Sequence, residues 1–408
     1  MSRPLLVIFL TIFVNLVGFG IIIPLLPFYA QTFGASPLTI GLLFASFSLS
    51  QLVASPLLGG LSDRWGRRPV LILSLVGTAI SFVMLAVAQS LAMLFAARIV
   101  DGLSGGNITT ARAYIADITT EEERPRAFGI LGAAFGLGFI VGPALGGALS
   151  HVSYTAPIWA AAGITVLAIA LAWMWLPETV HRAQAAVALP WHAVAGVLQR
   201  PGLRRLLAVD FIYWMAFAVY QTTFALFGAR RFGFDATHTG YLLSAFGVLG
   251  VIVQGGLVGP IAAALGSRRT LVVGLMFAAA GWAGSAATGS VPVFVAMLVP
   301  GAIGIGLCNA MLIAMVSTAA GRAEQGRVQG AAGALESFGR TLGPVWGNAL
   351  LQRSGEGVPF GAAAGLLVVA AVLARRYEPA AGSAAVLGAG AEPIVTAAGV
   401  DRADPAPR

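Results

Sequence analysis

The fold is decided by the stretch Gly59-Gly60-Leu61-Ser62-Asp63-Arg64-Trp65-Gly66-Arg67-Arg68, a dense charge cluster between two long apolar runs. These runs cover 37–61 and 69–88, and each has roughly the 20 residues needed to cross the hydrocarbon of a bilayer. A charged turn between two such helices has to lie in water, because charges and unpaired backbone groups are costly in lipid. Short loops rich in arginine stay on the cytosolic side. The stretch therefore predicts two membrane-spanning helices joined by a cytosolic turn.

The composition extends this prediction to the whole chain. Of 408 residues, 58% are hydrophobic and 10% are charged, whereas soluble domains have about 25% charged residues. All 24 basic residues are arginine, which excludes the Gly-Lys-Ser/Thr of an ATP-binding phosphate loop. The net charge of +8 is spread over many loops, which indicates membrane topology and argues against nucleic-acid binding. Cys308 is the single cysteine and the four histidines lie far apart, so we expect neither a disulfide, a metal site nor a cofactor.

Apolar runs of membrane-spanning length recur along the chain and predict twelve transmembrane helices. The expected spans are 5–29, 37–61, 69–88, 91–116, 126–149, 155–176, 205–228, 239–265, 269–289, 291–319, 327–352 and 357–375. With this count, one side of the membrane receives nearly all the arginines, and the other side receives only Arg230, Arg231 and Arg353. An even number of spans with both termini in the cytosol satisfies the positive-inside rule.

The two halves of the chain are internal repeats. After a shift of 201 residues, segment 126–149 matches segment 327–350 at ten of twenty-four positions. The shared pattern is Gly-x-x-x-Gly-Pro-x-x-Gly, which suggests two six-helix repeats in the same orientation around a central site. The expected domains are an N-terminal bundle 1–176, a cytoplasmic linker 177–204 with a surface helix at 191–198, a C-terminal bundle 205–376 and a disordered cytoplasmic tail 377–408.

The arginine-rich turn also resembles the loop between helices 2 and 3 of major facilitator superfamily transporters, since it has the spacing Gly-x-x-x-Asp-Arg-x-Gly-Arg-Arg. This resemblance covers nearly the whole chain and implies the major facilitator fold, an all-α membrane protein. It also implies a charge network that latches a cytosolic gate, although the alternative role of Asp63 is a helix-capping turn. The implied gating residues are Gly59, Asp63, Arg64, Gly66, Arg67, Arg68, Arg112 and Asp117.

A second motif narrows the resemblance to drug:proton antiporters of this superfamily. The segment from Gly138 to Gly147 is similar to their antiporter motif, with glycines at 138, 142, 146 and 147 and a proline at 143. Small residues let helices approach closely, so plain helix packing is an equally good explanation. The runs 113–119 and 20–27 resemble the tetracycline-resistance efflux proteins in particular. The motif residues are Gly138, Gly142, Pro143, Gly146 and Gly147.

The chain departs from the tetracycline exporters at their acidic positions. It has Asn15 where they have an aspartate in helix 1 and Ser81 where they have one in helix 3, and helix 9 contains no acid. A shared fold does not transfer a substrate. These departures favour an alternative function, import or facilitated passage of a small metabolite.

Charged residues inside predicted spans are candidates for proton coupling, because such groups are costly in lipid and usually functional. Asp101 lies about 15 Å into its helix, near mid-membrane, with Arg98 three positions away. Glu336 lies at a similar depth with Arg340 at i+4. The Asp101–Arg98 pair either exchanges a proton or is a fixed salt bridge that locks its helix. The Glu336–Arg340 pair is either a second proton site or a pair that bridges the two halves. Asp210, five residues after Arg205, is expected close to the cytosolic surface, where solvation at the interface explains it better than a role in transport.

Candidate substrate contacts are aromatic or uncharged polar. Tyr213, Phe217, Tyr220 and Phe224 recur at helical spacing beside Gln221, a pattern that suits either an amphiphilic aromatic ligand or plain packing. The polar candidates within spans are Asn15, Gln51, Asn107, Gln254 and Asn309.

Together these features predict a secondary active transporter in a bacterial inner membrane. It would exchange protons for an amphiphilic drug-like molecule, of the tetracycline or multidrug type, by alternating access. We expect a monomer in the lipid bilayer that uses neither ATP nor nucleic acid. The alternatives are the metabolite facilitator and, in another class, a non-transporting membrane sensor. A membrane enzyme is not expected, because no nucleophile–base or metal constellation is present.

Overall fold

The computed structural model describes residues 3–105, 107–120, 123–179, 199, 201–319 and 325–377, and in these ranges every regular element is helical. The helices are α1 (Arg3–Gln31), α2 (Pro37–Trp65), α3 (Arg67–Ala86), α4 (Leu91–Leu103), α5 (Asn107–Ile118), α6 (Arg124–Ser150), α7 (Ala156–Trp175), α9 (Pro201–Phe232), α10 (Ala236–Ile252), the π-helix η1 (Val253–Leu257), α11 (Val258–Leu265), α12 (Ser267–Ala287), α13 (Val291–Thr318), α14 (Gln325–Ser354) and α15 (Val358–Arg375). The predicted surface helix at 191–198 and the tail from 378 lie outside the described residues.

Within the described residues, ten helical runs are long and apolar enough to cross a membrane, counting α10, η1 and α11 as one run. The predicted fourth span corresponds to α4 and α5, which are separated at Ser104 and Gly105. The eleventh predicted span corresponds to α14. This helix is not among the ten runs, because charged residues inside it, such as Glu336 and Arg340, lower its mean hydropathy. The predicted all-helical membrane fold is therefore confirmed, and each of the twelve predicted spans coincides with one of these helices or broken helices.

Local sequence explains where several helices begin and end. Ser36 caps α2 by accepting a hydrogen bond from the Thr39 N–H, with Pro37 in the first turn. Ser90 caps α4 in the same way through Met93. Between α2 and α3 the backbone turns at Gly66 with φ of 104°, which a residue with a Cβ rarely adopts. The turn therefore requires a glycine at this position.

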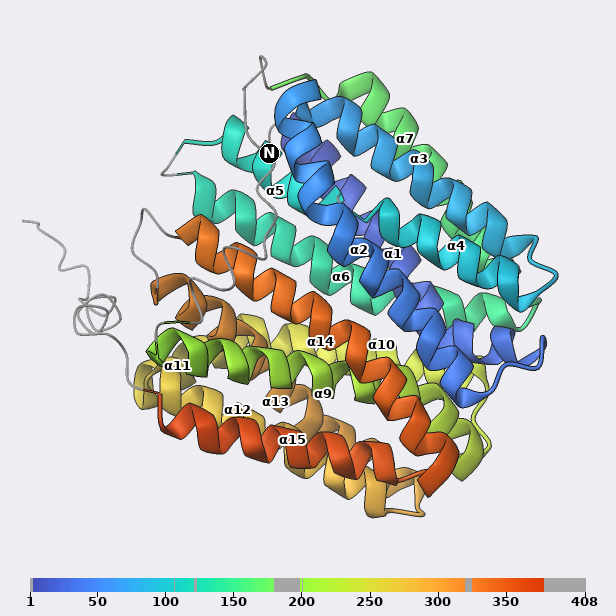
Figure 1. Cartoon of the computed structure of the whole chain (residues 1–408), viewed down its shortest axis with the longest axis vertical. Helices are drawn as coiled ribbons and strands as arrows, with labels where there is room; N and C mark the ends of the chain where they lie inside the picture. The colour runs from blue at the N-terminus through green and yellow to red at the C-terminus, as the bar shows by residue number, and fades with distance from the viewer. Residues whose placement is uncertain are drawn as a thin grey trace, which may run out of the picture.

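The helices pack into two groups. In the first group (α1–α7), α1 packs against α6 and α7, and α3 packs against α7 and α4. In the second group (α9–α15), α9 packs against α14 and α15, and α12 packs against α13 and α15. Figure 1 shows the first group, blue to green, above the second, green to red. Helix α14 packs on α9 as α6 packs on α1. This agrees with the sequence repeat, because the matching segments 126–149 and 327–350 lie in α6 and α14.

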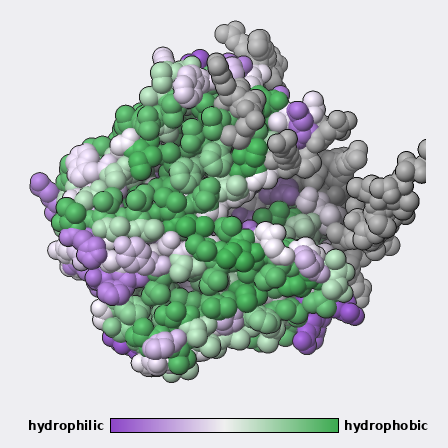
Figure 2. Space-filling model, turned by 180° about the vertical axis from the view of Figure 1, so that it is seen from behind, coloured by the Kyte–Doolittle hydropathy of each residue, from purple (hydrophilic) through white to green (hydrophobic). Residues whose placement is uncertain are grey.

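Two helix pairs form the main contacts between the groups, α6 with α10 and α2 with α14, and α1 and α2 make smaller contacts with α9 and α10. We call the end of the bundle that carries the α2–α3 turn the basic face, and the end that carries the connections 32–36, 151–155 and 233–235 the opposite face. In Figure 2, apolar residues cover much of the visible surface, hydrophilic residues gather toward its edges, and some lie in a recess between the groups. An apolar surface of this extent suits a lipid environment.

Contacts between the groups lie toward the opposite face. Gly41 approaches Pro344 so closely that a Cβ would lie 2.4 Å from the proline carbonyl oxygen, and a Cβ at Gly240 would lie 2.4 Å from that of Pro143. About three to four turns along α6 from Pro143 toward the basic face, a Cβ at Gly129 or Gly132 would have no described heavy atom within 4 Å. The groups are thus closed against each other at the opposite face and separate toward the basic face.

Candidate functional site

The first candidate site is a buried ion pair inside the first group. The Arg98 Nη1 atom lies 2.7 Å from Asp101 Oδ2, and the side chains are 0% and 10% exposed. The Phe47 ring covers the guanidinium at 4.3 Å. Within the described part of the chain, Nε and Nη2 of Arg98 have no hydrogen-bond partner. A buried pair with unused donors is a costly way to stabilise a helix, which favours a functional role over a fixed structural one.

The hydroxyl groups of helix α3 face this pair. Ser81 and Thr78 lie near the Asp101 carboxyl group, and the Ser81 hydroxyl donates its hydrogen bond to the Thr78 carbonyl at 2.8 Å. Ser81 is the position at which the chain lacks the aspartate expected from the resemblance. The structure therefore has a neutral hydroxyl near Asp101, where a second carboxylate would add like charge.

The second candidate site lies between α9 and α14. Glu336 and Arg340 on α14 lie near enough to Asp210 of α9 to interact with it electrostatically. The Arg340 guanidinium lies 5.3 Å from the Trp214 ring. Asp210 is only 2% exposed. The expectation that water at the membrane interface solvates Asp210 was wrong.

The position of Asp210 follows from how α9 and α14 pack. Helix α9 begins at Pro201, so Asp210 lies more than two turns inside it. A Cβ at Gly339 would lie 3.0 Å from both the Phe211 carbonyl oxygen and the Met215 nitrogen. Because the glycine lets α14 approach so closely, the carboxylate is covered by a neighbouring helix, which spacing along one helix does not reveal.

Arginine and carboxylate groups form a network at the basic face. Arg67 forms an ion pair with Asp63, and its Nε atom lies 3.0 Å from Asp117 Oδ2 on α5. Arg68 donates to the Trp173 carbonyl at 2.6 Å. This network joins α2, α3, α5 and the end of α7, all within the first group. Asp63 is thus an ion-pair partner of Arg67, not a capping residue.

Glu178 completes this network and was not singled out from the sequence. Its carboxylate accepts the backbone N–H groups of Arg67 at 2.9 Å and Arg68 at 3.2 Å. These donors lie at the first turn of α3, where helix N–H groups have no partner in the helix and the dipole favours a negative charge. A Cβ at Gly66 would lie 2.3 Å from this carboxylate. Only a long-range contact links Glu178 to the turn, so no local motif marks it.

The remaining predicted gating residues are placed as follows. Arg112 is exposed on α5 and acts electrostatically on Glu336 of the second group. Arg64 is in the last turn of α2. Gly59 has no described heavy atom within 4 Å of an added Cβ. Arg112 is therefore the predicted gating residue that acts on a charge of the other group.

The glycines of the predicted antiporter motif are close-contact positions. Added Cβ atoms would lie 2.4 Å from Leu16 Cβ at Gly138 and 2.7 Å from the Val17 carbonyl at Gly142. At Gly146 the nearest atom is the Ile21 carbonyl, 3.0 Å away. Gly147 instead faces α10, 3.0 Å from the Thr237 carbonyl. The motif thus holds α6 on α1 and also forms part of the contact between the groups.

Two members of the aromatic stripe on α9 pack inside the second group, so for them the structure favours the packing explanation. Tyr220 is 2% exposed and stacks on Trp282 with ring centroids 4.6 Å apart. Phe224 is 1% exposed and contacts Phe294 and Phe360. Both residues are corrected from candidate ligand contacts to core residues, because the neighbouring helices fill the space in front of them.

The other substrate candidates differ in their surroundings. Tyr213 is 1% exposed and belongs to the same core cluster as Tyr220 and Phe224, so it is corrected to a core residue too. Its ring stacks on that of the half-buried Phe217, with ring centroids 6.3 Å apart. Gln51 donates to the Gly105 carbonyl at 3.2 Å, so it ties α2 to the break between α4 and α5. Three further candidates, Asn15, Gln221 and Asn309, are half-buried. Gln254 is exposed on η1, and the Asn107 side chain lies outside the described residues.

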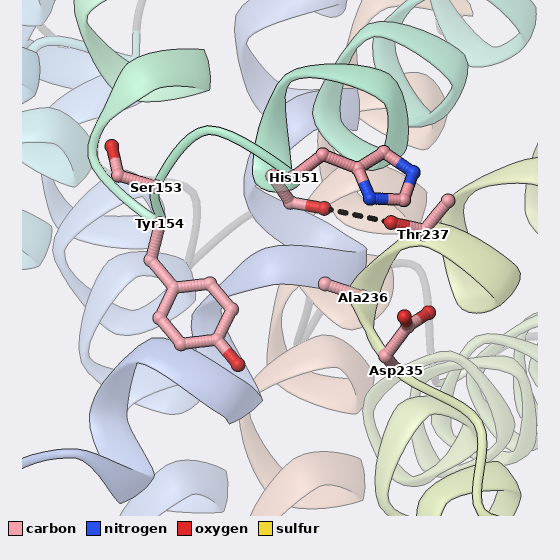
Figure 3. Close-up of a pocket in the computed structure, with 7 residues that line it drawn as sticks. His151, Ser153, Tyr154, Asp235, Ala236 and Thr237 are labelled. Carbon is pink, nitrogen blue, oxygen red and sulfur yellow. Dashed lines mark hydrogen bonds between the residues drawn. The ribbon is translucent and has the colours of Figure 1, made fainter.

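A pocket at the opposite face marks the contact between the groups. It has a volume of about 320 Å³ and lies between the α6–α7 connection and the start of α10. Figure 3 shows His151 and Tyr154 across from Asp235 and Thr237, and its dashed line is the 3.1 Å hydrogen bond between Ser150 and Thr237. Burial alone would raise the pKa of Asp235, but hydrogen bonds from the His238 backbone and side chain hold it below its ordinary value.

Comparisons with known proteins agree with this architecture. The model of the Major Facilitator Superfamily matches residues 8–261 and 255–400. The chain is 33% identical to the class C tetracycline resistance protein of Escherichia coli, covering 84% of this chain and 88% of that protein. It is 35% identical to the class G tetracycline resistance protein of Vibrio anguillarum, covering 86% and 91%. In fold it is similar to a bacterial homolog of the human lysosomal transporter Spinster, with a TM-score of 0.78 at 16% identity, covering 93% and 98%.

Proposed function

Because the chain belongs to the major facilitator superfamily, we propose that it exports an amphiphilic molecule of the tetracycline kind in exchange for protons, by alternating access. The observation that carries the proposal is that the two helix groups are closed against each other on one side only. They are in contact at Gly147–Gly240 and at Gly41–Pro344, and they are apart near Gly129. One-sided closure around buried charges is what a transporter with a central site requires. The identity of about a third to tetracycline resistance proteins supports the class of substrate.

In this proposal the two groups are rigid bodies that rock against each other. The N-terminal body covers 1–176, the linker 177–204 and the C-terminal body 205–376. The close glycine contacts of α6 on α1 and of α14 on α9 keep each body intact, since the helices interlock within a body. Contacts between bodies, such as the hydrogen bond from the Ser244 hydroxyl to the Ile140 carbonyl at 2.8 Å, break and re-form.

We place the basic face in the cytosol of a bacterium, with both termini on that side. The arginines of the α2–α3 turn and those near Arg204 and Arg375 support this orientation. Reporter fusions at Arg182 and after Arg376 test it, and we expect both reporters to be active only in the cytosol. Activity of either reporter on the outside of the cell would contradict the twelve-span arrangement.

The arginine network at the basic face is proposed to stabilise one of the two conformations. Asp63→Asn removes a carboxylate from Arg67 and leaves the other, Asp117, in place. We expect transport to slow several-fold with substrate affinity nearly unchanged, because the variant shifts an equilibrium between conformations and leaves the central residues intact. Transport rate and ligand binding are measured on the same purified protein.

A matched control for Asp63→Asn exists at the opposite face. Glu356→Gln removes a half-exposed carboxylate 3.8 Å from Arg231, and such pairs contribute about 0–1 kcal/mol. This variant is expected to behave like the unmodified chain. A loss of affinity in Asp63→Asn as large as its loss of transport rate would mean that Asp63 belongs to the binding site.

The metabolite facilitator is kept as the second candidate because Asn15 and Ser81 replace two acids expected of tetracycline exporters. Half-buried polar residues that remain available to a ligand are Asn15, Gln221 and Asn309. A panel of drugs and metabolites in inside-out vesicles with an imposed pH gradient separates the two functions. Export of a drug predicts gradient-driven accumulation of that drug, and facilitation predicts equilibration of a metabolite with no gradient.

A further inference from the structure

The eighth predicted span is not one regular helix. Its middle turn is the π-helix η1, in which the Val258 N–H donates to the Val253 carbonyl five residues before it. The segment reads Val-Gln-Gly-Gly-Leu, and glycine destabilises the interior of a helix relative to alanine. Single π-turns inside a longer helix are rare and are frequently found at functional places. This turn therefore needs an explanation within the fold.

Close packing does not explain the two glycines of η1. At Gly147 and Gly240 a glycine is required, because the backbones of α6 and α10 touch there. At Gly255 and Gly256, by contrast, an added Cβ would have no described heavy atom within 4 Å. Alanine would fit at both positions and would favour a regular helix. The two glycines thus weaken the helix at a place where packing does not require them.

The weak turn lies where the span passes from one helix group to the other. Before it, α10 packs mainly on α6 of the first group, and a Cβ at Gly136 of α6 would lie 2.7 Å from Val251 Cγ2. One turn further along α6, Gly132 has no described neighbour. After the turn, α11 packs on α12 and α13 of the second group. Val253 is the one buried residue of η1, and it packs against Gly306 of α13.

The first group has a helix-weakening residue at the matching position. After a shift of 200 residues, which aligns Gly59 with Gly259, Gly256 falls on Pro56 of α2. A proline inside a helix removes a backbone hydrogen bond and bends the helix. Helix α2 forms the other main contact between the groups, with α14. The second helix of each repeat is therefore weakened at the same place.

We propose that η1 is a hinge at which α10 swings relative to α11 and the rest of the second group when the opposite face opens. Helix α10 has to leave α6 for this face to open, since the two helices are in contact at Gly147 and Gly240. Bending at η1 lets α10 move while α11 keeps its contacts with α12 and α13. The hinge rests on the proposed alternating access and goes beyond it, because one helix then moves within a group that otherwise stays rigid.

The hinge is tested by distances between pairs of spin labels, measured by electron–electron double resonance on the purified full chain in lipid nanodiscs. The labels are attached to introduced cysteines, and the native Cys308 is buried and adds little background. One pair joins α10 to α15 and a second pair joins α11 to α15. The positions are exposed in both pairs: Tyr241 with Val358, and Leu265 with Val372.

Gly41→Val opens the opposite face without a change in α10. A Cβ at Gly41 would lie 2.4 Å from the Pro344 carbonyl oxygen, so the larger side chain separates α2 from α14. Between the unmodified chain and this variant, we expect the α10–α15 distance to change by several ångströms and the α11–α15 distance to stay the same. If the second group moves as one rigid body, both distances stay the same and the hinge is overturned.

A third pair of labels separates failure of the hinge from failure of the proposed function. Labels at Tyr241 and at the exposed Trp159 of α7 report how far α10 lies from the first group. We expect this distance to grow in Gly41→Val. A fixed distance would mean that the face does not open, which contradicts alternating access and the hinge together. Growth of this distance with a fixed α10–α15 distance would leave alternating access intact and overturn the hinge alone.

A stiffened variant tests the hinge without a bulky side chain. Gly255→Ala/Gly256→Ala favours a regular helix, and both methyl groups have room. We expect this double variant to slow transport several-fold and to narrow the distribution of the α10–α15 distance. Gly250→Ala is the matched control, with equal room on the same span but outside η1, and is expected to behave like the unmodified chain. Equal transport by the double variant and the control would show that bending at η1 is not used and would overturn the hinge.

Discussion

Asp101→Asn is expected to abolish uptake driven by a pH gradient into inside-out vesicles while substrate exchange at equal pH continues. Asp101 is a buried carboxylate of the first group, paired with Arg98 at 2.7 Å. An asparagine keeps the size of the side chain but cannot bind and release a proton. Exchange at equal pH needs only the conformational change, so it survives when coupling is lost.

The variant needs a control for folding, because it leaves Arg98 buried without its partner. Breaking a buried pair by removing one member costs about 3–5 kcal/mol. The double variant Arg98→Gln/Asp101→Asn has no unpaired charge, and Asp101→Glu keeps a carboxyl group. We expect the double variant to fold and to behave like Asp101→Asn in transport, and Asp101→Glu to regain part of the driven uptake. Full driven transport in Asp101→Asn would remove Asp101 from the coupling mechanism.

Gly240→Val is expected to prevent closure of the opposite face and to reduce transport to background. A Cβ at this position would lie 2.4 Å from the Pro143 carbonyl oxygen and 2.8 Å from the Gly147 Cα. Both atoms belong to the backbone of α6, so neither can rotate away and the helices must separate. The population then shifts toward the conformation in which this contact is open.

The closure is measured by labelling an engineered cysteine at Ser244, whose hydroxyl contacts the Ile140 carbonyl across the interface. Cys308, the native cysteine, is buried and contributes little background. In Gly240→Val we expect faster labelling from the opposite face. Gly250→Val is the matched control on the same helix, because an added Cβ there has no described heavy atom within 4 Å. Equal labelling of the two variants would show that the Gly240 contact does not close this face.

The sequence predicted what depends on patterns along the chain. Span lengths and arginine placement predicted the helical membrane fold, and the spacing of three residues predicted the contact between Arg98 and Asp101. The match of segment 126–149 with segment 327–350 anticipated that α6 and α14 pack in the same way. These features are local or repeated, so one sequence is enough to reveal them.

What the sequence did not predict depends on contacts between distant helices. Asp210 was placed at the surface because its depth was counted from Arg205, whereas Gly339 brings α14 over it. Tyr220 was a ligand candidate because an aromatic stripe has the same spacing whether it faces a ligand or Trp282. Glu178 lies 111 residues from Arg67, whose backbone N–H it accepts. Such residues are identified only once the packing is known.

Proton-driven export is tested most directly by tetracycline uptake into inside-out vesicles that contain the chain, with an acidic interior imposed and then collapsed by a protonophore. We predict that tetracycline accumulates above its external concentration while the gradient lasts and leaks out when the gradient collapses. Equilibration to the external concentration with no response to the protonophore would contradict proton coupling and favour the facilitator.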